Sequence, residues 1–269
     1  MDIINIEDLK NDIFYKGFPK ELADQVQAEV DKGNTEFPIL HPVQEGKDEA
    51  QYNVNFRYDE TSQKAYLNSF DLLLKSPDFG DQIRSHNFPE QQRVTAKEAY
   101  RMLKYGGLVA VNKNLFNKEG APYNTWLSLD TAGPKDQYDN YPVQSYHENY
   151  FKKHGPFDIK QELTALTAII PDLAKKGEID NATRKLQKAQ VLSYEANMNG
   201  EAVSVVLTAN PMDRIIEVRD TGFNIIEGLR EQVQSQQSAT ADQKKNSLNQ
   251  QSAPPKKSQK PQWNKGNRM

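Results

Sequence analysis

Cysteine is absent from all 269 residues of this sequence. Its absence excludes disulfide bonds, thiolate nucleophiles and cysteine-ligated zinc or iron–sulfur sites. Long hydrophobic runs are also missing, because no stretch approaches the roughly 18 consecutive apolar residues that span a bilayer. The first ten residues, MDIINIEDLK, carry acids where a signal peptide would carry basic residues and an apolar segment. We therefore expect a cytoplasmic protein with no membrane partner.

Histidine is scarce, with four in the chain. His147 and His154 are seven residues apart, a spacing unlike the i, i+4 pair of helical zinc sites. The alternative to a metal site is that these two histidines form a pair at the edge of a hairpin, and this interpretation is favoured. His147 and Glu148 have acid–base chemistry, but adjacent residues of a strand point to opposite faces. The sequence thus predicts no metal site, no cofactor and no catalytic residue, which favours a protein that is not an enzyme.

Apolar residues are few, and charge is unevenly distributed. The hydrophobic fraction of 36% and the mean hydropathy of −0.83 are low for a chain that folds along its whole length. From residue 227 onward there are 8 Lys/Arg and 3 Asp/Glu, which gives this segment a charge of +5. Because the net charge of the whole chain is −3, residues 1–226 carry a charge of −8. Residues 227–269 are rich in Gln, Ser, Lys and Pro and have few apolar residues. Burial of so little apolar surface cannot offset the conformational entropy that the chain would lose on becoming ordered. We predict a disordered basic tail.

The end of this tail combines cations with one aromatic residue. A segment of this kind neutralises phosphates and can stack on a base, which makes nucleic acid the candidate partner. The alternative is that a lysine-rich tail only keeps the protein soluble. The predicted nucleic-acid-binding residues are Lys256, Lys257, Lys260, Trp263, Lys265 and Arg268.

Hydrophobic periodicity divides the rest of the chain into two predicted units. Residues 5–33 predict two short helices, and alternating apolar residues in 52–58 and 65–75 predict an antiparallel hairpin, so 1–76 forms the first unit. Residues 77–92 are polar, contain two prolines and show no period, which predicts a linker.

The second predicted unit spans residues 93–226. Thr95 and Glu98 have the spacing of a capping box, which predicts a helix start. Further helices are predicted at 158–170 and 178–189, and three strands follow, the first two joined by a type I′ turn at Asn199-Gly200. The fold class is α+β, with small antiparallel sheets packed with short helices.

The segment NKEGAPYNTWLSLD, residues 117–130, is the most distinctive passage. A phosphate-binding loop needs two glycines and a following Lys-Ser/Thr at a helix start, whereas this segment has one glycine and precedes a strand. We predict a turn at 117–120, with positive φ at Gly120, between two strands. Trp126 is then either buried or an exposed stacking surface, and burial is favoured because large aromatics usually serve packing.

A family resemblance follows from this passage. Residues 99–130, AYRMLKYGGLVAVNKNLFNKEGAPYNTWLSLD, resemble the signature GRAV-K-L-NKEG-YNAW-QLD of a domain-of-unknown-function family on conjugative and other mobile elements of Bacteroidota-type bacteria. Residues 144–150, QSYHENY, are similar to its QFHENYGYDL segment, and 208–211 to its EANP ending. The resemblance covers about residues 5–226. Residues 107–111, GLVAV, lack the arginine of the signature, and NYFKKHGPFDI is an expanded segment.

This resemblance implies a mobile-element context, such as a conjugative transposon, and no catalytic residues. The expected function is therefore a non-enzymatic accessory protein, a binding module whose basic tail contacts nucleic acid. The alternative is a protein–protein interaction scaffold, or an anti-restriction or anti-defence factor that binds a host protein with its acidic body. The sequence does not discriminate between them.

Overall fold

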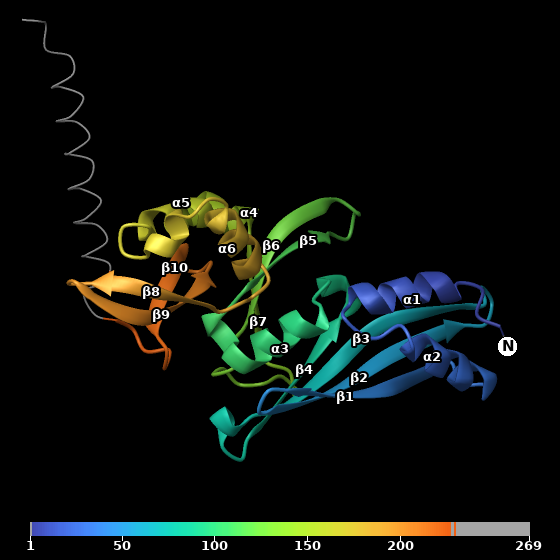
Figure 1. Ribbon diagram of the computed structural model, residues 1–269. Coiled ribbons are helices and arrows are strands. Elements are labelled where there is room, and N and C mark those ends of the chain that lie inside the picture. Colours follow the sequence, from blue (N-terminus) through green and yellow to red (C-terminus); the bar gives the residue numbers. More distant parts are fainter. Residues whose placement is uncertain (1, 227–228, 230–269) are drawn as a thin grey trace, which may run out of the picture. The chain divides into compact units, whose positions relative to one another are not determined.

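The computed structural model describes residues 2–226 and Leu229. Within residues 2–226, six α-helices accompany three antiparallel sheets (Figure 1), so the predicted α+β class is confirmed. Contacts group residues 1–226 into one compact unit. The predicted boundaries at 76 and 226 stay predictions.

The first sheet is a four-stranded antiparallel meander in the order β1-β2-β3-β4. Along β2 and β3, buried residues alternate with more exposed ones, because successive side chains of a strand point to opposite faces. The hairpin of β2 and β3 and the two preceding helices confirm the sequence prediction. The elements are α1 (Ile6–Tyr15), α2 (Leu22–Asp31), β1 (Glu36–Glu45), β2 (Asp48–Asp59), β3 (Lys64–Lys75) and β4 (Ile83–Pro89).

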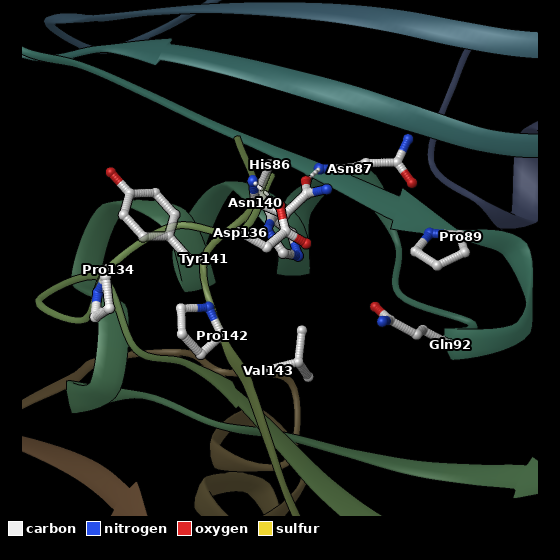
Figure 2. Close-up of a pocket in the computed structure, with 10 residues that line it drawn as sticks. All are labelled: His86, Asn87, Pro89, Gln92, Pro134, Asp136, Asn140, Tyr141, Pro142 and Val143. Carbon is white, nitrogen blue, oxygen red and sulfur yellow. Dashed lines mark hydrogen bonds between the residues drawn. The ribbon is translucent and has the colours of Figure 1, made fainter. Parts of the chain in front are cut away.

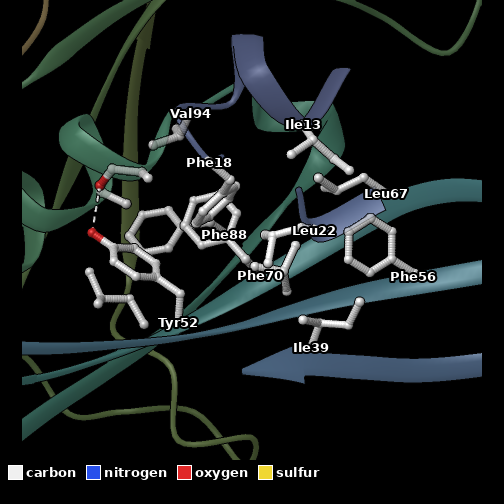
Figure 3. Packing of buried hydrophobic residues seen from close by; sticks show 14 of the residues in the cluster. Ile13, Phe18, Leu22, Ile39, Tyr52, Phe56, Leu67, Phe70, Phe88 and Val94 are labelled. Carbon is white, nitrogen blue, oxygen red and sulfur yellow. Dashed lines mark hydrogen bonds between the residues drawn. The ribbon is translucent and has the colours of Figure 1, made fainter. Parts of the chain in front are cut away.

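Helices α1 and α2 lie against one face of this sheet (Figure 1). Figure 3 shows Ile13 of α1 and Leu22 above the sheet residues Phe56 and Phe70, and these side chains are all at most 2% exposed. Tyr52 keeps its hydroxyl satisfied in the same core by donating to the carbonyl of Ala96, at 3.1 Å. Burial of such side chains contributes roughly 1.5–3 kcal/mol each and holds the helices on the sheet.

The linker predicted for residues 77–92 needs correction. The segment contains the 3-10 turns η1 (Pro77–Phe79) and η2 (Glu90–Gln92), and between them β4 pairs with β3 along its whole length. Phe88 stacks on Phe70 of β3, with ring centroids 5.3 Å apart. Only two residues of β4 face the core, so the apolar alternation is too short to stand out from polar neighbours.

Strand β1 was also not predicted, because two prolines interrupt its sequence. Pro38 and Pro42 lie on the free edge of the sheet, where β1 has β2 as its single neighbour. An edge strand tolerates proline at positions whose amide would point away from the neighbouring strand. The prolines are therefore compatible with a strand ten residues long.

The second sheet has the order β5-β6-β7 and follows α3. The capping box is confirmed, since the Glu98 amide donates to Thr95 Oγ1 at 3.4 Å and the Thr95 amide to Glu98 Oε2 at 2.8 Å. The turn before β6 is also confirmed, with Gly120 at φ +78°. The elements are α3 (Ala96–Tyr105), η3 (Gly106–Leu108), β5 (Val111–Phe116), β6 (Pro122–Leu129), β7 (Val143–His147) and α4 (Glu148–His154).

The third sheet has the order β10-β9-β8 and packs with α5 and α6. Asn199 and Gly200 have φ of 55° and 91°, the two positive values that a type I′ turn requires, so the predicted hairpin is confirmed. The elements are α5 (Ile159–Leu166), η4 (Pro171–Ala174), α6 (Glu178–Leu186), β8 (Leu192–Met198), β9 (Glu201–Asn210) and β10 (Ile215–Asp220). Across the part of the chain that the structure describes, no helix has the length and apolar character needed to cross a membrane.

Candidate ligand cavity beside strand β4

A cavity of about 410 Å³ lies between β4–η2 on one side and the loop of residues 134–143 on the other (Figure 2). Its apolar lining includes Pro89, Pro134 and Pro142, together with Tyr141 and Val143. The volume falls within the range of roughly 300–1,000 Å³ that is typical of small-molecule sites. The cavity is therefore large enough for a ligand of nucleoside size.

The loop owes its shape to Asp136. Its Oδ1 accepts hydrogen bonds from the amides of Tyr138, at 2.8 Å, and Asn140, at 2.9 Å. The Asp136 amide in turn donates to the Asn140 carbonyl at 2.9 Å. An aspartate that bonds its own backbone in this way stabilises a tight turn, so the sequence itself places Asn140 beside Asp136.

Three hydrogen bonds attach this turn to the edge of β4. In one of them, Ser85 Oγ donates to Asp139 Oδ2 at 2.6 Å. The Asn87 amide donates to Asn140 Oδ1 at 2.7 Å, and this bond joins residues 53 positions apart. Lys135 Nζ donates to Ser85 Oγ at 2.9 Å and to Asp139 Oδ2 at 2.8 Å. These bonds fix one wall of the cavity against the strand.

His86 is the buried polar residue of the cavity lining. Its side chain is 4% exposed, and neither ring nitrogen has a hydrogen-bond partner among the described residues. Burial lowers its pKa to about 4, and Asp136 and Asp71, which raise it, and Lys135, which lowers it, contribute less. His86 is therefore neutral at pH 7, with one N–H donor and one acceptor nitrogen.

Amide groups add further hydrogen-bonding capacity. Within the described chain, neither the Gln92 side-chain amide nor Asn140 Nδ2 has a partner. The side-chain amide of Asn87, in contrast, already has a partner, because its Nδ2 donates to Asp71 Oδ1 at 2.7 Å. The lining thus combines neutral donors and acceptors with the carboxylate of Asp136.

Cations of the cavity region are already paired. Lys135 is bonded to Asp139 and Ser85, and its ammonium group lies 4.7 Å from the centre of the Tyr141 ring. In the described lining no lysine or arginine is present, so nothing there favours an anion such as phosphate. No hydroxyl or carboxylate of the described residues bonds to His86 either, and a general-base arrangement would need such a partner.

Of the residues singled out in the sequence, the six of the tail lie outside the described part of the chain, whereas Trp126 lies within it. All six predicted tail residues, Lys256, Lys257, Lys260, Trp263, Lys265 and Arg268, lie outside the described residues. Trp126 is 5% exposed and its ring lies 5.4 Å from that of Phe157, which confirms it as a core residue.

The two histidines considered as a pair flank the unpredicted helix α4. His147 is the N-cap, accepting from the Asn149 amide at Nδ1 at 3.3 Å, and His154 is the last helical residue. The hairpin-edge interpretation is therefore wrong for His154. Over residues 2–226 and Leu229, no group of three or more His, Asp or Glu side chains could hold a metal ion.

Sequence reasoning missed His86 and the loop that faces it. The alternation of His86 and Phe88 was the available signal, but it spans one strand repeat only. Comparisons with known proteins add no relative, since no family model, no curated protein and no solved structure matches this chain. The resemblance to the mobile-element family stays a prediction.

Proposed function

We propose that this protein is a non-enzymatic binding module that contacts nucleic acid through its basic segment 256–268 and serves a mobile genetic element in the cytoplasm. Charge separation is the observation that carries the proposal: residues 227–269 bear +5 and residues 1–226 bear −8. A polyanion is repelled by the acidic part and attracted by the basic part. Affinity for nucleic acid therefore resides in the basic segment.

Two half-buried lysines of the folded unit are paired within the fold. Lys104 Nζ lies 2.5 Å from Asp48 Oδ2, and Lys113 Nζ lies 2.5 Å from Glu98 Oε2. Both carboxylates are buried, so these ammonium groups are committed to compensating buried negative charge. They are not available to neutralise phosphates.

Aromatic stacking points to the same segment. The chain has two tryptophans, and Trp126 is buried against Phe157. Trp263 is then the tryptophan that remains to stack on a base, and it stands among the five cations of the segment. The mobile-element context rests on the sequence resemblance alone.

Salt titration of oligonucleotide binding tests the proposal. Labelled single- and double-stranded oligonucleotides are titrated with the full chain at several salt concentrations. Five cations on single-stranded phosphates predict a slope of log K against log salt of about −3 to −4, with little sequence preference. A full-length variant with the five cations changed to glutamine should lose this slope, and Trp263→Ala should weaken binding while leaving the slope unchanged.

Two results would contradict the proposal. If the five-glutamine variant binds as tightly as the parent, the site lies on the folded unit. If neither protein binds at low salt, the segment only solubilises the chain and the protein scaffold becomes the better hypothesis. Affinity capture with and without nuclease would then show whether a protein partner is retained.

A further inference from the structure

We propose that the cavity beside β4 binds a neutral, planar nitrogen heterocycle with adjacent hydrogen-bond donors and acceptors, the chemistry of a nucleobase. Such a base could be carried by a free nucleoside or be an unstacked base of a single strand. Binding of a free nucleoside depends on the cavity alone, whereas binding of a base within a single strand also rests on the proposed function. Three observations carry it: the buried imidazole, the charge of the lining, and its size and composition.

The buried imidazole of His86 is a polar ring at a position where packing alone would favour an apolar ring. His86 is 4% exposed, and its ring lies edge-on to Phe88 with centroids 4.7 Å apart. A phenylalanine could make the same contact without leaving two nitrogens unpaired. A buried polar group without a partner is destabilising, and a bound molecule that opens the lining enough to reach these two nitrogens would remove that cost.

The charge of the lining selects against anions. His86 is neutral, Gln92 and Asn140 offer uncharged amides, and Asp136 adds a carboxylate whose Oδ1 is bonded within its own turn. A phosphate would meet this carboxylate without a compensating cation, since the nearby Lys135 is bonded to Asp139. The preferred ligand is therefore uncharged and presents N–H groups as well as acceptors.

Size and composition narrow the ligand class further. About 410 Å³ accommodates a nucleoside, and proline, tyrosine and valine side chains provide apolar contacts for a flat ring. Base edges present donors and acceptors side by side, which amide side chains match with paired hydrogen bonds. Sites that take up an unstacked base combine such bonds with packing between apolar or aromatic side chains. The lining of this cavity has both components.

Calorimetric titration of the full chain with individual nucleosides tests the inference. Adenosine, guanosine, cytidine and uridine are the probes, and we expect at least one of them to bind. His86→Phe should lower its affinity about tenfold or more, and Gln92→Ala should lower it about fivefold, because each removes hydrogen bonds to the ring. His41→Phe is the matched control: it makes the same exchange on β1, away from the cavity, and should leave affinity unchanged.

Thermal unfolding without nucleoside separates binding from folding. At pH 7, the His86→Phe protein should unfold at a temperature at least as high as the parent. A lower unfolding temperature would mean that the ring nitrogens have a structural partner, which would overturn the assignment of His86 to a ligand. Gln92→Ala still tests the cavity in that event.

Oligonucleotides identify the source of the base. If the ligand is a base within a strand, His86→Phe weakens binding of the matching oligonucleotide while the salt slope of the basic segment is unchanged. If oligonucleotide binding is unaffected but nucleoside binding is lost, the cavity takes the free nucleoside. The inference fails if no nucleoside binds, if the parent and His86→Phe bind equally, or if inorganic phosphate displaces the nucleoside. Failure here would leave the salt-dependent binding of the basic segment untouched.

Discussion

Acid should destabilise this protein through His86, and the size of the effect follows from the burial of one imidazole. The ring is 4% exposed, and burial lowers its pKa from 6.5 to about 4. Below pH 6.5, the unfolded chain takes up a proton at this position and the folded chain does not. The contribution of the neutral ring is thus fully present above pH 6.5 and is lost as the pH falls towards 4.

The magnitude is large relative to the stability of a domain. At about 1.4 kcal/mol for each tenfold difference in proton affinity, a fall from 6.5 to about 4 corresponds to about 3 kcal/mol. Asp136 and Asp71 favour the protonated ring and Lys135 opposes it, but burial outweighs all three. A typical domain unfolds with only about 5–15 kcal/mol, so a change of about 3 kcal/mol is a substantial part of its stability.

Urea denaturation at pH 7, 6, 5 and 4 measures the effect when the parent is compared with His86→Phe. Carboxylates and the other histidines titrate in both proteins, so their contributions cancel in the difference. The free energy of unfolding of the parent should fall relative to the variant by about 3 kcal/mol across this range. Parallel pH profiles would refute the reasoning, since they would mean that the folded protein protonates His86 as readily as the unfolded chain does.

Three further substitutions, one of them with a matched surface control, probe the fold. Trp126→Ala should lower the free energy of unfolding in urea by about 3–5 kcal/mol, because the indole is buried. The control Tyr138→Ala, at a residue 75% exposed, should change it by less than about 0.5 kcal/mol. Equal effects of the two substitutions would contradict the assignment of Trp126 to the core. Lys104→Met should cost about 3–5 kcal/mol by leaving the buried carboxylate of Asp48 without its counter-ion, and a neutral result would show that Asp48 is solvated. Thr95→Ala should cost about 1 kcal/mol through loss of the capping box, visible as a lower thermal midpoint, and no shift would mean that the cap is dispensable.

Local chemistry explains which parts of the fold could be predicted from the sequence. Thr95 and Glu98 form a capping box by bonding to each other across three residues. Asn199 and Gly200 both have positive φ and so form the two-residue turn of their hairpin. Each of these motifs can be recognised from a few consecutive residues. Gly120 is similar, since its positive φ serves a turn of four residues. The three closing strands are predicted from their apolar content and the turn between them, since β9 buries five consecutive residues and shows no alternation there.

Long-range contacts explain what was missed. Strand β4 is recognisable through its pairing with β3, and its own apolar content is two residues. The cavity depends on the bond between Asn87 and Asn140, which are far apart in the sequence and carry no motif. Helix α4 has seven residues, with no buried residue, so it has no apolar face to detect. Nothing in a linear pattern brings His86 and Asp136 into one lining.

The two prolines of β1 and the loop attached to β4 share a consequence for recognition. Pro38 and Pro42 remove two main-chain donors from one border of the first sheet. At the other border, the Asn87 amide is already occupied by Asn140. Another chain that sought to extend this sheet would find few main-chain groups with which to pair at either border. These features oppose the addition of a further strand at either border, and so they disfavour self-association of this protein through its first sheet.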